Sequence, residues 1–502
     1  MIKKKYSISI IIVILFIIPF FAQESNIFLN RDYWKSNPSI ANINQKIAEG
    51  HDIAELNRFA FDAVSWALIE KVDNETVKYL LSKEGNGVNK LTHDGRTYIF
   101  WAAYKNNLEM MQYLVDRGAK TDIIDSHGYS LLNFVAVTGQ TNTKLYDFIF
   151  DHGPDAFKEL NHDGANALLL VAPFLEDFWL INYFTSKGID LKSTDNNGNG
   201  IFYYAAKGGN IKFLDLLIEK GLPHKNLNTK GGNAMVSASQ GTRGKKNTLE
   251  TYKYLQSKGI AVNIVGDNGK SPLHNVAYDS EDLELFKFFI DNGVDVNHQD
   301  DDGNSPFMNA TGQNTLEVIT YLLQYVKDVN AINKNGRAAL TMAVSRNDVE
   351  VVNFLLEKGA DISIIDEEGN SLVYDLLNSY RSNDTEAFDA KLKLLTNAGL
   401  DMSRTQGHGK TLYHLAVEKN NLDLLKRVYD EFKIDDINAK NNDGLTPLHV
   451  AAMKAKNQEI LKFLISIGAD KTAKTDFEES VYDLASENEL LQKNNVNINF
   501  LE

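Results

Sequence analysis

The sequence predicts an all-α solenoid, a stack of short helix–loop–helix units, and three observations support this. The chain has 502 residues, more than a single compact core usually holds. A turn followed by a helix start recurs along it at spacings of 33 to 40 residues. A second apolar helix follows each start and usually ends at a glycine. Such units bury their apolar faces only against neighbours, so they must stack.

The composition indicates a folded protein and excludes several kinds of partner and site. Apolar residues make up 43% and charged residues 24% of the chain, as in ordinary folded proteins. The formal charge of −15 argues against nucleic acid and anionic membranes as main partners. The chain has no cysteine, which excludes disulfides, thiolate zinc sites and cysteine nucleophiles.

Residues 1–23 are interpreted as a signal peptide. Three lysines, Lys3 to Lys5, precede an apolar run from Ile8 to Ala22. This run is shorter than the roughly 20 residues that a membrane span needs. We therefore expect export to the periplasm or outside the cell, and an uncleaved membrane anchor is the alternative. No later segment is apolar enough to span a membrane, so no further membrane contact is expected.

Four segments follow the signal peptide. Residues 24–37 form a polar lead-in, and residues 38–61 form an N-terminal capping half-repeat whose helix carries Ile40, Ile43 and Ile47 on one face. Residues 62–477 form the repeat array. Residues 478–502 form a more charged C-terminal capping repeat and tail, because a terminal unit needs a polar outer face.

The stretch DGLTPLHVAA, residues 443–452, shows the unit most clearly. Gly444 suits a tight turn, Thr446 can cap the helix, and Pro447 fits its first position. We call the residue equivalent to Thr446 the anchor of its repeat. Eleven of the thirteen anchors are Ser, Thr, Asp or Asn. The anchors are Asp62, Thr97, Ser130, Asn166, Gly200, Asn233, Ser271, Ser305, Ala338, Ser371, Thr411, Thr446 and Ser480.

These motifs resemble ankyrin repeats. TPLHVAA at 446–452, SPLHNVA at 271–277 and TLYHLAV at 411–417 match the start of that repeat, and KGADI at 358–362 and NGVDVN at 292–297 match its end. The chain is similar to an exported bacterial ankyrin repeat protein, which implies an ankyrin-repeat α-solenoid of about 13 units with a half-repeat cap. Several early copies lack the Pro and His of the motif.

The resemblance also implies roles for particular positions. His274, His414 and His449 would each tie a turn to its neighbour by a hydrogen bond. The concave face, made of turn tips and first helices, would contact another protein. The acidic and amide side chains at the tips favour a basic or polar partner surface. The candidate partner-binding tip residues are Asp94, His127, Asp301, Asp302, Asn335, Asn442 and Asp443.

Insertions lengthen the period at two main places. Residues 240–247 carry Arg243, Lys245 and Lys246, the one basic cluster of the acidic mature chain. This insertion is either a solvated loop or a contact loop for an acidic partner. Residues 379–386 are a second insertion, with the same two interpretations.

No catalytic, cofactor or metal site is predicted. Gly269-Lys270-Ser271 resembles the end of a P-loop, but the required earlier glycine is Ile264. Asp300 to Gly303 resembles a calcium loop, but Asn309 stands where the loop needs Glu. Aromatic residues recur at one motif position and are assigned to packing between repeats rather than to a ligand stripe. They are Trp66, Trp101, Phe134 and Tyr204.

The sequence therefore predicts a non-catalytic, monomeric scaffold that binds a partner protein after export. Two alternatives stay open. One is a secreted effector or toxin-neutralising protein that acts outside the cell. The other is an enzyme with a site in the degenerate units between residues 166 and 240, which would need a deep pocket of converging titratable groups.

Overall fold

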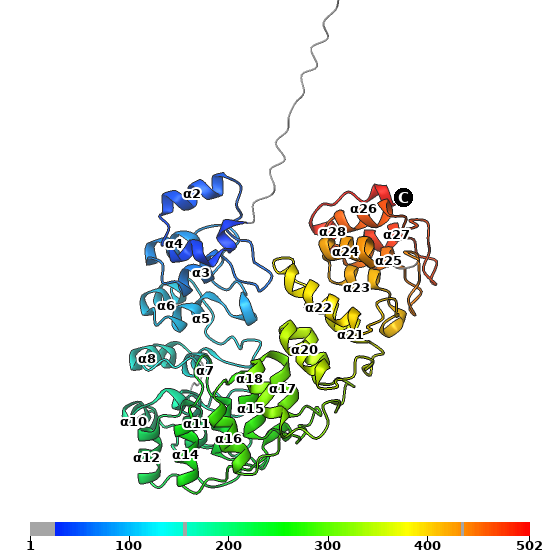
Figure 1. Cartoon of the computed structure of the whole chain (residues 1–502). Helices are drawn as coiled ribbons and strands as arrows, with labels where there is room; N and C mark the ends of the chain where they lie inside the picture. The colour runs from blue at the N-terminus through cyan, green and yellow to red at the C-terminus, as the bar shows by residue number, and fades with distance from the viewer. Residues whose placement is uncertain (1–25, 154–157, 433–435) are drawn as a thin grey trace, which may run out of the picture. The chain divides into compact units, whose positions relative to one another are not determined.

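The computed structural model describes residues 26–153, 158–432 and 436–502 (Figure 1). Within these ranges the regular structure is helical. The β-structure there consists of isolated bridges, and no β-strand is present. The all-α prediction is therefore confirmed. The predicted signal peptide lies outside the described residues.

The chain divides into two compact units, described separately below. Unit 1 runs to Val171 and includes Asp177–Asn196. It begins with η1 (Ile27–Leu29), α1 (Arg31–Lys35) and α2 (Ile40–Ala48). Its repeat helices are α3 (Ala63–Ile69), α4 (Asn74–Leu81), α5 (Tyr98–Tyr104), α6 (Leu108–Val115), α7 (Leu131–Val137), α8 (Thr143–His152), α9 (Ala167–Val171) and α10 (Trp179–Ser186), with η2 (His93–Gly95) in one turn.

Unit 2 contains Ala172–Glu176 and Asn197–Glu502. Its α-helices are α11 (Ile201–Gly208), α12 (Ile211–Glu219), α13 (Ala234–Gln240), α14 (Leu249–Ser257), α15 (Pro272–Asp279), α16 (Leu283–Asp291), α17 (Pro306–Gln313), α18 (Leu316–Leu323), α19 (Ala339–Arg346), α20 (Val349–Glu357), α21 (Leu372–Ser379), α22 (Thr385–Asn397), α23 (Leu412–Glu418), α24 (Leu422–Phe432), α25 (Pro447–Lys454), α26 (Glu459–Ser466), α27 (Val481–Glu487) and α28 (Glu489–Lys493). Its short 3-10 helices are η3 (Ala172–Phe174), η4 (Asp267–Gly269), η5 (Gly407–Gly409) and η6 (Asn499–Leu501).

Each repeat contributes a first and a second helix, and like helices stack on like (Figure 1). In unit 1, α3 contacts α5, α5 contacts α7, and α7 contacts α9. In unit 2, every first helix from α11 to α27 contacts the next first helix. First helices are therefore buried almost all round, and in α5 every residue from Tyr98 to Ala103 is buried. Second helices bury one face and expose the other.

The anchors stand immediately before the first helices, as the spacing predicts. Asp62, Ser305 and Thr446, for example, are N-caps whose side chains accept hydrogen bonds from the helix backbone. A glycine two residues before most anchors has a positive φ, as Gly444 does at 73°. Ala60 and Glu478 hold that conformation in the first and last repeats.

Two parts of the chain differ from the sequence prediction. The lead-in, predicted as merely polar, contains η1 and α1 and buries Phe28 and Trp34 completely. The indole N–H of Trp34 donates to the carbonyl of Phe28 at 2.9 Å and so holds η1 and α1 together. Both η1 and α1 contact α3, so this segment covers the first repeat helix of unit 1. The insertion at residues 379–386 does not form one loop, because α21 extends to Ser379 and α22 begins at Thr385. Part of the added length lies in α22, which has 13 residues.

Candidate partner-binding surface

Most repeats open with a tight hairpin that one Asp or Asn side chain, buried or half-buried, organises. In the hairpin before Ser305, Asp300 Oδ1 accepts hydrogen bonds from the backbone N–H groups of Asp302 and Asn304, at 3.0 and 2.9 Å. The same arrangement recurs five residues before other anchors, at Asn57, Asp125, Asn161, Asn228, Asn333, Asp366 and Asn441. Sequence analysis missed this role, although the recurrence of Asp or Asn at this position could have indicated it.

Backbone hydrogen bonds join successive hairpin tips. The N–H of Lys334 donates to the carbonyl of Asp302 at 2.9 Å, and the N–H of Glu367 donates to Asn335 at 3.0 Å. Equivalent bonds join Asp94 to Ser126 in unit 1, and Asn268 to Asp301 and His408 to Asn442 in unit 2. These bonds hold neighbouring tips in register, so the side chains at the tips are presented on a fixed edge.

Most of the predicted tip residues project from this edge. His127, Asp301, Asp302, Asn335, Asn442 and Asp443 are all exposed. Asp94 is different because its Oδ2 is already paired, with Arg96 at 3.0 Å and with His127 Nε2 at 3.2 Å. Its carboxylate therefore links two hairpins of unit 1.

The basic insertion folds into a small turn, in which Thr242 and Lys245 form an isolated bridge. Lys245 Nζ donates to the carbonyl of Gly208 at 2.9 Å, and Lys246 Nζ pairs with Asp279 at 3.0 Å. Two of the three predicted basic contacts are thus attached to neighbouring repeats. Arg243 is exposed and has no ion pair within the described chain.

Beside this insertion lies a polar cavity of about 320 Å³ in unit 2. The repeats that begin at Asn233, Ser271 and Ser305 contribute to it. Sequence analysis identified Lys246 as a candidate but not the cavity, because its walls come from three repeats. The lining residues are Ser239, Gln240, Lys246, Lys270, His274, Asn275, Tyr278, Asp300, Asn304 and Asn309.

The three motif histidines of unit 2 each join two repeats, as the resemblance implied. His274 Nδ1 lies 2.9 Å from Ser271 Oγ, and its Nε2 lies 3.1 Å from the carbonyl of Asn304 in the next repeat. His414 makes the equivalent contacts to Thr411 and to the carbonyl of Leu445. His449 contacts its own anchor Thr446 in the same way, but its Nε2 lies 3.0 Å from the carbonyl of Ala473, at a different position of the next repeat. Burial lowers the pKa of His274 to about 4, so the ring is neutral at pH 7. Burial also lowers the pKa of His414 and His449.

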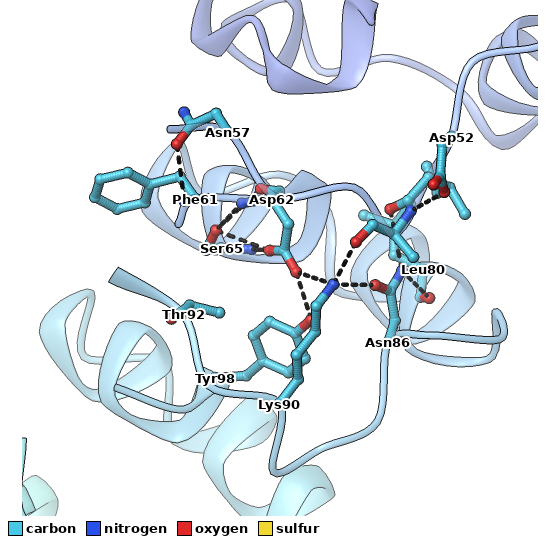
Figure 2. A network of polar contacts seen from close by, with 12 residues as sticks. Asp52, Asn57, Phe61, Asp62, Ser65, Leu80, Asn86, Lys90, Thr92 and Tyr98 are labelled. Atoms are coloured by element: carbon cyan, nitrogen blue, oxygen red, sulfur yellow. Dashed lines mark hydrogen bonds and ion pairs between the residues drawn. The ribbon is translucent and has the colours of Figure 1, made fainter. Parts of the chain in front are cut away.

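Unit 1 makes its first joint differently (Figure 2). Asp62 Oδ1 accepts from the backbone N–H of Ser65 at 2.9 Å, while Oδ2 accepts from the Tyr98 hydroxyl at 2.6 Å. Lys90 Nζ lies 2.8 Å from the same Oδ2 and also donates to the carbonyl of Ala54 at 2.7 Å. Burial, reinforced by the Asp62 charge, raises the pKa of Tyr98 strongly, so its hydroxyl stays a donor.

Comparison with known protein families agrees with this geometry. A family model described as ankyrin repeats (3 copies) matches residues 64–161, 273–366 and 382–475, together more than half of the chain. The chain belongs to the ankyrin repeat family. Ankyrin repeats are generally protein–protein interaction modules, and homologous repeats are generally non-enzymatic scaffolds.

Curated relatives share the repeats over limited segments. The chain is 27% identical to an ankyrin repeat protein of Variola virus over 21% of its own length and 19% of the relative. It is 37% identical to the human B-cell lymphoma 3 protein over 16% of its length and 18% of that protein. It is 42% identical to a putative ankyrin repeat protein of Rickettsia bellii over 14% of its length and 45% of the relative. The matched region thus spans less than half of each relative.

The aromatic side chains at the recurring motif position pack between ankyrin repeats. Trp101 and Phe134 are buried, with ring centroids 6.1 Å apart. Trp66, partly exposed, stacks on Phe61 at 4.2 Å. These contacts agree with the predicted packing role.

A column of exposed aliphatic side chains runs beside the hairpins of unit 1, and sequence analysis missed it. Leu91, Ile124 and Leu160, each six residues before an anchor, are 59%, 58% and 56% exposed. Val265 and Ile332 hold this position in unit 2, where Lys440 and Lys474 replace them near the C-terminus. In unit 2, Gln299 holds this position in its repeat, and its amide donates to the carbonyl of Ile332 at 2.9 Å, so the position is adjacent in these two successive repeats.

The described ranges contain no cluster of metal ligands and no helix long and apolar enough to span a membrane. No group of three or more His, Asp or Glu side chains there could hold a metal ion. Among the helices of the described chain, none combines the length and apolar character that crossing a membrane requires.

Proposed function

We propose that the chain is a non-catalytic scaffold that binds a protein partner through its hairpin tips and first helices. The observation that carries this proposal is the hydrogen-bonded edge of tips, because it presents exposed side chains from successive repeats at fixed positions. A backbone that is already held in place loses little conformational entropy when a partner binds.

The exposed aliphatic column supports the same surface. Leu91, Ile124 and Leu160 lie next to polar tips, and interfaces of this kind combine an apolar centre with a polar rim. Contiguous exposed apolar side chains on a soluble protein commonly mark a binding surface.

The charge of the tips indicates the kind of partner. Asp301, Asp302 and Asp443 are exposed and acidic, which favours a basic or polar partner surface opposite them. Arg243 and the neighbouring lysines are the exception and favour an acidic segment at that one place.

The proposal includes export before binding, to the periplasm in particular. It rests on the basic and apolar pattern of residues 1–23. Fractionation together with a mass spectrum of the mature N-terminus tests this part. An intact N-terminus in the cytosol would contradict it, and recovery from the culture medium would favour the secreted effector instead.

A crosslinking pull-down with the tagged full-length chain tests the binding proposal. The test variant is Asp302→Lys, which reverses the charge of an exposed tip. The matched control is Glu350→Lys, the same charge change at an exposed position at the start of α20. We expect the wild type and the control to capture one dominant protein and Asp302→Lys to lose it. Equal capture by all three proteins, or capture of none, would overturn the assignment of this surface.

A further inference from the structure

The polar cavity beside the insertion has the features of a site for a single carboxylate. Its walls are formed by α13, α15 and α17, by the insertion, and by the hairpins before α15 and α17. All of its lining side chains are polar, and its volume of about 320 Å³ is at the lower end of the range for ligand pockets.

The floor of the cavity is fixed by hydrogen bonds within the protein. The Asn275 amide donates to Ser239 Oγ at 2.8 Å, and the Asn309 amide donates to the carbonyl of His274 at 3.1 Å. His274 Nε2 contacts the carbonyl of Asn304. These bonds tie three repeats together, so the cavity is built before a ligand arrives.

Several donors around the cavity are not used by the protein. The Lys270 ammonium, the Tyr278 hydroxyl and the Gln240 amide make no hydrogen bond to any part of the chain that the structure describes. Lys246 has one carboxylate partner, Asp279, and keeps further ammonium protons. Four side chains, two from each of two neighbouring repeats, thus line the cavity with hydrogen-bond donors, and a carboxylate has about four acceptor positions.

The charges around the cavity favour an anion. Lys270 has no carboxylate within ion-pair distance in the described ranges. Asp300, the acidic lining residue, is buried and holds two backbone N–H groups with Oδ1. Arg243 and Lys245 add positive charge beside the cavity, in a chain whose net charge is −15.

The geometry favours a carboxylate over a phosphate group. Proteins usually hold phosphate with free backbone N–H groups at a helix N-terminus. Here α15 begins with Pro272, which has no N–H, and the N–H of Ser271 already donates to His274 Nδ1 at 3.1 Å. The donors that remain are side chains.

We propose that this cavity binds an acidic side chain, Asp or Glu, of the partner protein, with Lys270 as its main charge partner. The inference rests on the proposed scaffold function and names the chemistry of one part of its interface. Lys246, Tyr278 and Gln240 supply the remaining hydrogen bonds.

The test measures binding of a fluorescently labelled peptide, Gly-Glu-Glu-Glu-Gly, to the full chain by fluorescence anisotropy. The comparison peptide contains Gln in place of Glu. We expect the Glu peptide to bind at least tenfold more tightly than the Gln peptide. We also expect Lys270→Gln to weaken Glu-peptide binding at least tenfold. Lys287→Gln, the same charge change on an exposed side chain of α16 outside the cavity, should weaken it less than threefold.

Other results would overturn the inference. Equal binding of the two peptides, absence of binding, or equal losses from Lys270→Gln and Lys287→Gln would show that the cavity does not select a carboxylate. Displacement of the peptide by free glutarate at concentrations similar to the peptide's own would assign the site to small carboxylates instead. A wild-type pull-down that still captures a partner would then show that the scaffold function stands and that only this inference fails.

Discussion

Unit 1 and unit 2 join their repeats at the same place in the backbone but with different chemistry. In unit 2, a neutral histidine links its own anchor to the next hairpin, as His274 does between Ser271 and Asn304. In unit 1, the anchor itself is a buried carboxylate, Asp62, held by Tyr98 and Lys90 from the next repeat (Figure 2). The ankyrin backbone therefore accepts more than one set of hydrogen-bonding side chains at this joint.

The two solutions respond differently to perturbation. A buried charge that loses its partner strongly lowers the free energy of unfolding. Loss of a neutral histidine lowers it only by the contribution of its hydrogen bonds. A histidine kept neutral by burial, however, becomes sensitive to acid. The following predictions separate these behaviours.

The largest effect is expected from Asp62→Ala. It removes the helix cap and leaves the Lys90 ammonium and the Tyr98 hydroxyl without their shared acceptor. We expect the free energy of unfolding of this region to fall by about 4 kcal/mol. Urea denaturation, with hydrogen exchange of α3 and α5 to localise the change, measures it. Asp32→Ala, at an exposed carboxylate paired with Lys35, is the control and should leave the free energy of unfolding almost unchanged. A loss below about 1 kcal/mol at Asp62 would contradict the charged joint.

Acid should weaken the unit 2 joint. The pKa of His274 is about 4 in the folded protein, against an ordinary value of 6.5, so between these values the unfolded chain binds a proton that the folded chain does not. The stabilisation is therefore complete above pH 6.5 and is lost as the pH falls toward 4. This difference in pKa corresponds to a loss of about 3 kcal/mol in the free energy of unfolding.

His274→Gln keeps a donor near the carbonyl of Asn304 but does not titrate. The difference in unfolding free energy between wild type and this variant should therefore shrink by that amount from pH 7 to pH 4. A difference that does not depend on pH would show that the ring of His274 is not held neutral by burial.

Gly303 tests the joint that both units share, the contact between hairpin tips. A Cβ there would lie 2.7 Å from the backbone nitrogen of Lys334, and φ is +81°. Gly359 has a similar φ of +85°, but a Cβ would meet nothing within 4 Å. We expect Gly359→Ala to cost about 1 kcal/mol and Gly303→Ala about 2 kcal/mol or more, by thermal or urea denaturation. Equal costs would mean that the tips are not in close contact.

Asn133 lies at a joint that has neither a histidine like His274 nor a buried carboxylate like Asp62. It takes the place of the motif histidine in unit 1, is completely buried, and both of its side-chain polar atoms lack partners among the described residues. Asn133→Leu removes this cost, so we expect unfolding to become harder by about 1 kcal/mol. Asn133→Ala removes the same groups but leaves a cavity and serves as the comparison. Destabilisation by Leu would show that a bound water satisfies the amide.

The repeat architecture could be predicted because each copy repeats the same local signals. The anchors and the turn glycines act within a few residues of chain, so spacing located them, and the ankyrin resemblance supplied the role of the motif histidines. The joint at Asp62 could not be predicted in this way, because Lys90 and Tyr98 are distant in sequence and match no motif. The burial of Phe28 and Trp34 was missed for a different reason: a short segment of mostly polar residues gives no periodic pattern.

The candidate site was only partly predictable. The exposed tips such as Asp302 and Asn335 followed from the motif, but the hairpin-organising roles of Asp300 and Asn333 did not. In the insertion, the sequence located the positive charge of Lys245 and Lys246, but not that both side chains bond to neighbouring repeats. The cavity around Lys270 needed three repeats to be placed together before it could be recognised.

Site-specific photo-crosslinking tests the central claim, that the edge of hairpin tips binds a partner protein, most directly. A photoreactive amino acid would replace Asp302 in one full-length chain and Glu350 in another, and both would be irradiated in cells. The account predicts one discrete crosslinked protein from position 302 and none from position 350. The same crosslinked protein from both positions, or from position 350 alone, would contradict it.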